Sequence, residues 1–232
     1  MAVAKLRRSC YNSLMQNVLL LLVFLLSGCA ASYVPPADHV LLSPEEVPEC
    51  RFPEWSVPGE PLLLRHTAFL EAGEQELVLQ GLVLLDNERS KAQVVGMTEL
   101  GMKLFDLTVT SKNHYQNYLS PAIGSRKKAL ADLIALSTRR IFLFGEYPES
   151  PDVYLGPQSF LMINSVMGSQ MAYKCSATDN TLLKQFSPVQ NWQAEHSGYQ
   201  VIKGRYIPQR TVYQDKRAGY RLILVLHEVS AP

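Results

Sequence analysis

The apolar positions between residues 62 and 110 fall into short runs separated by polar turns. Four of these runs predict β-strands over 62–70, 75–85, 91–97 and 102–110. The turns between them are short, so neighbouring strands should pair antiparallel. In the fourth run Phe105, Leu107 and Val109 alternate with polar residues, whereas the first three runs are apolar on both faces. We therefore expect either that both faces of these three strands are covered or that one face stays apolar for a ligand.

One segment has the spacing of an amphipathic helix. It runs over 125–136, with Ser125 as the expected N-cap. Its apolar side consists of Ala129, Leu130, Leu133, Ile134 and Leu136. Its first turn holds the basic residues Arg126, Lys127 and Lys128, at the unfavourable end of the helix dipole. They indicate either a solvated helix start or a contact with a partner or an anionic head group.

Beyond the helix the strand pattern returns. A strand is expected over 139–145, a loop with three prolines over 146–157, and an ambiguous segment over 159–166. Four further strands are expected over 171–176, 192–200, 205–214 and 220–229. With many strands and one clear helix, the pattern predicts a mainly β fold of the α+β class.

The N-terminus has the composition of a secretory signal. Lys5, Arg7 and Arg8 precede an unbroken apolar run over 18–26. A helix that spans a bilayer needs about 20 apolar residues, so this run is too short for that role. Its length fits the core of a signal peptide.

The residues that follow this core resemble the bacterial lipobox. Positions 26–29 read Leu-Ser-Gly-Cys, with two small residues between an apolar residue and a cysteine. The resemblance implies cleavage between Gly28 and Cys29 and attachment of a diacylglyceryl group to Cys29. The alternative is an ordinary signal peptide that is cut near Ala30 and Ala31.

These signals divide the chain into three parts. Residues 1–28 are the expected signal peptide, 29–61 a lipidated and proline-rich tether, and 62–232 one folded domain. Within the tether, the apolar side chains around Phe52 and Trp55 offer anchors against the folded body. A protein with two or more acyl chains is held stably on a membrane. By resemblance to the enterobacterial sorting rule, Ala30 after the cysteine favours the periplasmic face of the outer membrane.

Net charge limits the classes of partner that the chain can bind, and cysteine content bears on the redox state of its compartment. The chain has 22 Lys plus Arg and 21 Asp plus Glu, and three of the basic residues but none of the acidic ones lie in 1–28. The processed chain therefore has a formal net charge of −2, which argues against a nucleic-acid partner. Cys10 leaves with the signal and Cys29 takes the lipid, so Cys50 and Cys175 remain in an oxidising compartment. They form either a disulfide that staples the entering segment to the body or two separate thiols.

The motifs of enzymes are missing from the sequence. It contains no Gly-x-Ser-x-Gly elbow, no His-Glu-x-x-His pair, no glycine-rich phosphate loop and no Cys/His spacing for zinc. Its five histidines, His39, His66, His114, His196 and His227, are scattered singly. We therefore expect no catalytic residues, no metal, no cofactor and no enzymatic activity.

The order of the elements is similar to the lipoprotein carriers and receptors of the outer-membrane localisation pathway, the LolA/LolB-like superfamily. Three features carry the resemblance: the early strands that lead to Glu99-Leu100-Gly101, the single helix, and a C-terminal succession. That succession comprises Asn191-Trp192-Gln193, Tyr199, Arg-Tyr-Ile-Pro-Gln-Arg at 205–210 and a closing strand that begins at Tyr220. The resemblance implies an incomplete antiparallel β-barrel, or half-barrel, that covers one or more helices. The match covers roughly residues 62–229 and is closer to an uncharacterised lipoprotein family whose members often occur beside aryl-polyene biosynthesis genes.

The resemblance also implies an apolar cavity between sheet and helix. Its expected lining is Phe105, Leu107, Val109, Leu130 and Leu133, although the same residues would serve equally as packed core. A lined cavity implies a protein that binds or passes on an acyl chain, a lipid or a lipoprotein, including an aryl-polyene lipid, with a soluble periplasmic carrier as partner. A packed core implies a lipoprotein that scaffolds an envelope complex and binds nothing small.

Overall fold

The computed structural model describes residues 33–55, 60–86, 88–143, 150–166 and 169–232. Tyr33–Pro232 forms one compact unit with its own hydrophobic core, which is the property of a part that folds by itself. The expected signal peptide, the cleavage position at Gly28 and the lipidation position at Cys29 lie outside the described residues.

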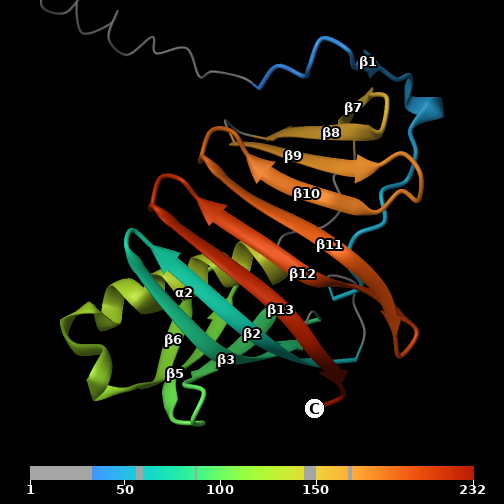
Figure 1. Ribbon diagram of the computed structural model, residues 1–232. Helices are drawn as coiled ribbons and strands as arrows, with labels where there is room; N and C mark the ends of the chain where they lie inside the picture. Colours follow the sequence, from blue (N-terminus) through green and yellow to red (C-terminus); the bar gives the residue numbers. More distant parts are fainter. Residues whose placement is uncertain (1–32, 56–59, 87, 144–149, 167–168) are drawn as a thin grey trace, which may run out of the picture. The chain divides into compact units, whose positions relative to one another are not determined.

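One antiparallel sheet dominates the described residues (Figure 1). It contains thirteen strands in the order β1-β7-β8-β9-β10-β11-β12-β13-β2-β3-β4-β5-β6. Their bounds are β1 Val40–Leu41, β2 Leu62–Ala72, β3 Gln75–Asp86, β4 Lys91–Met97, β5 Lys103–Thr110, β6 His114–Leu119, β7 Asp152–Leu155, β8 Ser159–Val166, β9 Ser169–Ser176, β10 Leu182–Ser187, β11 Trp192–Ile202, β12 Arg205–Asp215 and β13 Tyr220–Ser230. The first and last strands in this order do not pair, so the sheet stays open.

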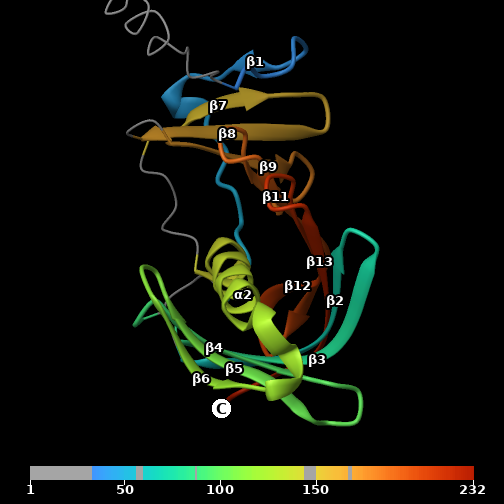
Figure 2. The same cartoon turned by 90° about the vertical axis from the view of Figure 1, so that its left-hand side faces the viewer.

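The helix α2, Lys127–Phe142, lies on the concave side of this sheet. Figure 2 shows β4, β5 and β6 curving beneath it, while β12, β13 and β2 stand beside it. Two short 3-10 segments, η1 Pro44–Glu46 and η2 Pro121–Arg126, complete the described helices, and η2 is kinked at Gly124, where φ is +68°. The predicted mainly β fold, an incomplete antiparallel barrel around a helix, is confirmed.

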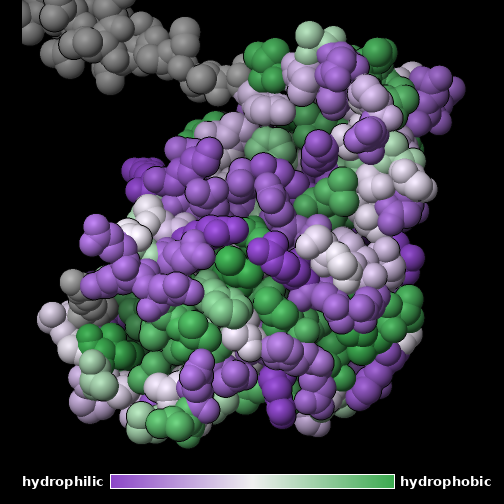
Figure 3. Space-filling model, in the orientation of Figure 1, coloured by the Kyte–Doolittle hydropathy of each residue, from purple (hydrophilic) through white to green (hydrophobic). Residues whose placement is uncertain are grey.

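Both faces of the central strands carry apolar side chains, as their sequence predicts. Leu64 and Ala68 of β2 point inward and are buried, while Phe69 is half-buried on the outer face. Further half-buried apolar residues of the outer face are Leu63, Val78, Leu82, Ile223 and Val225. Figure 3 shows this outer face, with apolar residues gathered over β2, β3 and β13. In the described residues α2 covers only the inner face.

The structure corrects the expected strand over 139–145. Residues 139–142 continue α2, because Ile141 and Phe142 extend the buried side of the helix and Arg139 donates through Nε to the Thr110 carbonyl at 2.8 Å. A short apolar run does not reveal its period, so strand and helix look alike in such a segment. The expected N-cap at Ser125 is also wrong, because α2 begins at Lys127. The side-chain cap in this region belongs to the preceding segment η2, where Ser120 Oγ accepts a hydrogen bond from the Ala122 N–H.

Several strands were not expected from the sequence pattern. The edge strand β6 is polar and exposed, β7 lies inside the expected proline-rich loop, and β10 has little alternation. The ambiguous segment 159–166 is the strand β8. These segments form strands because they pair with neighbouring strands. Such pairing satisfies the backbone N–H and C=O groups whatever the side-chain pattern is.

Much of the expected tether packs on the sheet. Cys50 and Cys175 form a disulfide, with 5.9 Å between their Cα atoms. Glu54 accepts a hydrogen bond through Oε2 from the Tyr206 N–H at 2.7 Å, and Trp55 is buried against Phe142. Through these contacts the segment that leads into β2 becomes part of the folded unit.

Candidate functional site

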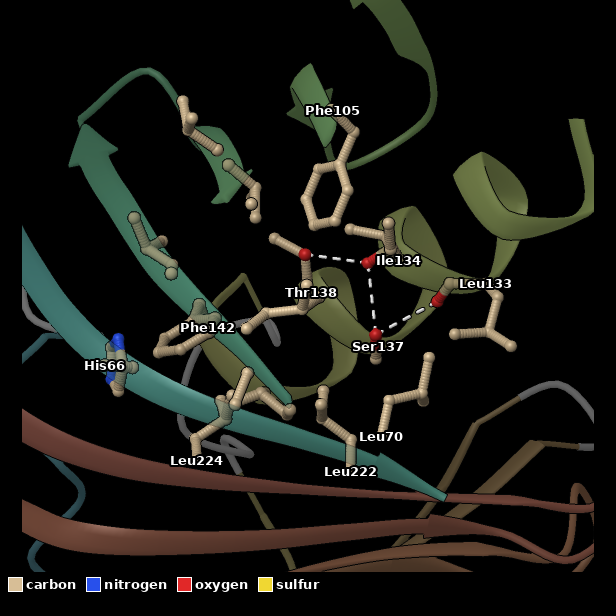
Figure 4. A pocket seen from close by; sticks show the side chains of 18 of the residues that line it. His66, Leu70, Phe105, Leu133, Ile134, Ser137, Thr138, Phe142, Leu222 and Leu224 are labelled. Carbon is tan, nitrogen blue, oxygen red and sulfur yellow. Dashed lines mark hydrogen bonds between the residues drawn. The ribbon is translucent and has the colours of Figure 1, made fainter. Parts of the chain in front are cut away.

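An apolar cavity lies between the inner face of the sheet and α2 (Figure 4). Its volume is about 70 Å³, and its walls come from β2, β3, β4, β5, β13 and the helix. A single enclosed water needs about 10–15 Å³, so the cavity has room for a few atoms of a ligand chain. Its walls expose almost no polar atoms, which favours hydrocarbon over water.

The floor of the cavity is a row of four residues that face one another across four strands. His66 of β2 pairs with Gly81 of β3, Gly81 with Gly96 of β4, and Gly96 with Phe105 of β5. The two glycines in the middle leave a groove across the sheet, because neither carries a side chain. A glycine inside a strand often marks a place where a ligand or another chain approaches closely.

The two glycines differ in what lies above them. At Gly96 an added Cβ would overlap the ring of Phe105, which therefore lies directly on that glycine. At Gly81 an added Cβ would meet nothing closer than 3.8 Å, and its nearest side-chain atom would be His66 Cβ at 3.9 Å. The groove is thus filled by Phe105 at one glycine and open at the other.

The roof of the cavity comes from one side of α2. Leu133, Ile134 and Phe142 point toward the strands in Figure 4. Two hydroxyls also lie on this side, but each donates within the helix: Ser137 Oγ to the Leu133 carbonyl at 3.0 Å and Thr138 Oγ1 to the Ile134 carbonyl at 2.7 Å. Because the helix backbone satisfies these hydroxyls, the roof offers the cavity an apolar surface.

His66 brings a polar ring to the cavity wall. The residue is 3% exposed, and its Nδ1 has no hydrogen-bond partner among the described residues. Burial, together with a smaller charge repulsion from His227, lowers its pKa from 6.5 to about 3. The ring is therefore neutral at pH 7, with one nitrogen that donates and one that accepts.

The helix is held firmly at its C-terminal end. Arg140 donates through Nη1 to Asp215 Oδ2 at 2.7 Å and to the Tyr213 hydroxyl at 2.6 Å, and through Nη2 to Gln190 Oε1 at 3.0 Å. Its guanidinium also lies 4.7 Å from the centre of the Trp192 ring. A guanidinium that is only 15% exposed and has this many partners fixes the position of the last helical turn.

The N-terminal half of the helix has weaker links to the sheet. The Tyr220 hydroxyl donates to the Leu133 carbonyl at 3.5 Å, and His114 lies 3.3 Å from the half-exposed Asp132. The turn of chain before it contains the kink at Gly124. The two ends of α2 therefore differ in how tightly the structure holds them.

The structure separates the five residues that the sequence proposes as cavity lining. Phe105, Leu130 and Leu133 line the cavity, whereas Leu107 and Val109 are fully buried in the packed core beside it. Cavity wall and packed core thus occur side by side in one sheet.

The sequence reasoning missed the residues that shape the cavity most. His66 is one of five scattered histidines, and Gly81 and Gly96 each interrupt an apolar strand. The glycines were a usable signal, because a glycine in the interior of a strand weakens it unless space is needed there. Their alignment could not be read from the sequence, since it depends on the strand register.

Two further observations concern the described residues as a whole. No group of three or more His, Cys, Asp or Glu residues in them is placed to hold a metal ion. None of their helices is both long enough and apolar enough to cross a bilayer.

Comparisons with known proteins give likenesses of structure only. No protein-family model matches the chain, and no curated protein matches it. A LolA superfamily protein from Nitrosomonas europaea is similar, with 11% identity, a TM-score of 0.46 and coverage of 77% of this chain and 89% of that chain. An outer membrane lipoprotein-sorting protein domain from Vibrio parahaemolyticus has 9% identity, a TM-score of 0.41 and coverage of 74% and 85%. A DUF1329 family protein from Desulfovibrio piger has 9% identity, a TM-score of 0.44 and coverage of 77% and 88%. Likenesses at this level carry no functional argument, so the function is inferred from the cavity itself.

Proposed function

We propose that this protein binds one acyl or polyene chain in the cavity between α2 and the sheet. The observation that carries the proposal is the groove at Gly81, which stays open beside the Phe105-filled position at Gly96 in an otherwise packed apolar interior. A binding site for a hydrocarbon needs apolar walls and few polar groups, and this cavity has both properties. No catalytic role is proposed, because the cavity wall carries one neutral histidine, two hydroxyls that donate to helix carbonyls, and no carboxylate or thiol.

A whole chain needs more room than about 70 Å³, so the cavity must widen when it binds. The loosely held N-terminal half of α2 supplies that movement, while the Arg140–Asp215 pair keeps the C-terminal turn in place. Burying ten methylenes would contribute about 8 kcal/mol, which is enough to offset the loss of a few packing contacts along Leu130 and Leu133.

The proposed place of action is the periplasmic face of the outer membrane. Supporting it are the basic start, the apolar core and the Leu-Ser-Gly-Cys sequence that ends at Cys29. The Cys50–Cys175 disulfide agrees with an oxidising compartment. An anchored protein of this kind would exchange its chain with a soluble periplasmic carrier.

The test is to measure whether the unit Tyr33–Pro232 binds a polyene fatty acid. We expect one equivalent to bind, with its fluorescence rising, and a bound chain to appear as a discrete mass in native mass spectrometry. In the variant Gly81→Val the added side chain would fill the groove, and binding should fall by at least tenfold. The matched control is Gln80→Val, which places the same side chain on the outer face of the same strand.

The competing role is a scaffold that holds partners on the membrane and binds nothing small. The full burial of Leu107 and Val109 next to the cavity favours it. No uptake of the fatty acid by the unaltered protein, at concentrations up to its solubility, would establish this second role in place of the first.

A further inference from the structure

We infer that the chain in this cavity lies with a terminal hydroxyl-bearing group innermost, hydrogen-bonded to His66. The ligand class is a long hydrocarbon that ends in a neutral hydroxyl, as in an alcohol or a protonated carboxylic acid. This inference rests on the proposed function and deepens it by naming the end of the ligand that the cavity recognises.

The cavity has a closed end and an open end. At the closed end Ile141 and Phe142 are buried, and Trp55 packs behind Phe142 with 5.3 Å between ring centres. At the other end Leu133 and Leu222 are only half-buried. A ligand therefore enters past the leucines and reaches the closed end last.

His66 stands at the closed end. Its ring lies 6.0 Å from that of Phe142, and Figure 4 shows the two side by side, away from Leu133. Because Gly81 is its neighbour on β3, there is space beside the histidine ring where any other residue would place a side chain. A group at the inner end of a bound chain would occupy this space.

His66 lines the cavity, and its Nδ1 is buried with no hydrogen-bond partner among the described residues. The other side chains on the wall that carry polar atoms, Ser137 and Thr138, already donate to helix carbonyls. A buried nitrogen without a partner costs stability, and a ligand that supplies the missing hydrogen bond recovers that loss. A plain hydrocarbon end cannot do so.

The chemistry of the ring selects a neutral hydroxyl. Burial keeps the pKa of His66 at about 3, so the free ring carries one N–H and one bare nitrogen. A hydroxyl both donates and accepts, and it therefore fits whichever nitrogen carries the proton. An ionised head group would bring an unpaired charge into an apolar cavity, which is strongly unfavourable.

The experiment compares decanol with undecane, which have the same number of non-hydrogen atoms. Each displaces N-phenylnaphthylamine from the unit Tyr33–Pro232, and the ratio of the two affinities is measured. In His66→Leu, which keeps the volume but removes the nitrogens, we expect the ratio to shift against decanol by about tenfold. His66→Gln, which restores a hydrogen-bonding group, should recover part of the preference.

A second buried histidine provides the matched control. His196 is also 3% exposed and has an unpartnered Nε2, but it does not line this cavity. His196→Leu should leave the ratio unchanged. The ring ¹⁵N resonances of His66 should shift on adding decanol but not undecane, which reports the contact even if a variant folds poorly.

The outcomes separate the two proposals. An unchanged ratio in His66→Leu, with both ligands bound, overturns the role of His66 and leaves the hydrocarbon site intact. Failure of both ligands to displace the probe from the unaltered protein overturns the site itself. Decanoic acid serves as a third ligand: binding that strengthens as pH falls from 7 to 5 identifies the protonated carboxyl as the natural end group, and binding that does not points to an alcohol.

Discussion

The ring of Phe105 lies on Gly96, so closely that the glycine has no room for even a methyl group. The two residues face each other across β4 and β5. This contact closes one half of the glycine groove, while the half at Gly81 stays open. The difference between the two glycines leads directly to a test of the cavity.

Gly96→Ala should destabilise the protein, whereas Gly81→Ala should not. The first change forces the ring of Phe105 from its place, and overpacking of this kind costs about 1–3 kcal/mol. The second adds a methyl group that meets His66 at ordinary van der Waals distances of 3.8–3.9 Å, so the free energy of unfolding should hold or rise slightly. Urea denaturation measures both effects.

The same pair separates stability from binding. Gly81→Ala takes the room of about one methylene, so the affinity for a saturated chain should fall about fourfold, equivalent to about 0.8 kcal/mol. If Gly81→Ala bound the chain as well as the unaltered protein, the groove would not be the site.

The two buried histidines make stability depend on pH. Burial lowers the pKa values of His66 and His196 from 6.5 to about 3, so between these values the unfolded chain binds protons that the folded protein does not. The part of the free energy of unfolding that depends on these two neutral histidines is fully present above pH 6.5. It is lost as the pH falls toward 3. Between pH 7 and pH 5 we expect a loss of about 2 kcal/mol for each histidine.

Denaturation at several pH values checks this expectation. His66→Leu should remove about half of the pH dependence, and at pH 7 it should be as stable as the unaltered protein or more so, because the unpartnered nitrogen is gone. A curve of the same steepness in the variant would show that His66 titrates normally in the folded protein.

The disulfide should contribute strongly to stability. It joins Cys50 to Cys175 across 125 positions of sequence, and the loss of such a bridge costs about 2–5 kcal/mol. Reducing agent should therefore lower the melting temperature of the unaltered protein. The double variant Cys50→Ala, Cys175→Ala should already melt at the lower temperature and should not respond to the reducing agent.

The Arg140–Asp215 pair should be the costliest ion pair to break. Asp215 is 4% exposed at its side chain, and Asp215→Ala leaves the guanidinium buried without its charge partner, at a cost of about 3–5 kcal/mol. The control is Glu71→Ala, which breaks the exposed pair with Arg221, where the side chains are 39% and 41% exposed. That loss should stay below about 1 kcal/mol. Equal losses in thermal unfolding would mean that Arg140 does not hold the helix.

Membrane attachment should depend on one cysteine. In cells, Cys29→Ala should move the protein from the membrane fraction to the soluble periplasmic fraction, since the acyl chains that anchor it are lost. Cys10→Ala should have no effect, because that residue lies in the predicted signal peptide. Mass spectrometry of the unaltered protein should show the lipid on Cys29, and a protein cut near Ala30 and Ala31 without lipid would contradict the prediction.

The sequence by itself determined the class of the fold and most of its strands. Alternation in residues such as Phe105, Leu107 and Val109 identifies a strand with one buried face, because a strand repeats every two residues. Turn residues such as Gly101, which has a φ of +79° in the structure, mark the strand ends. Such signals are local, so they need no knowledge of distant partners.

Tertiary structure decided the rest, because those features depend on register and packing between distant segments. Helix α2 continues to Phe142 because Ile141 and Phe142 are buried when this segment is helical, although its sequence is equally compatible with a strand. The cavity exists because strand register brings His66, Gly81, Gly96 and Phe105 into one row. A shift of one residue in any pairing would turn these side chains to the other face and remove the groove, which is why no single strand reveals it.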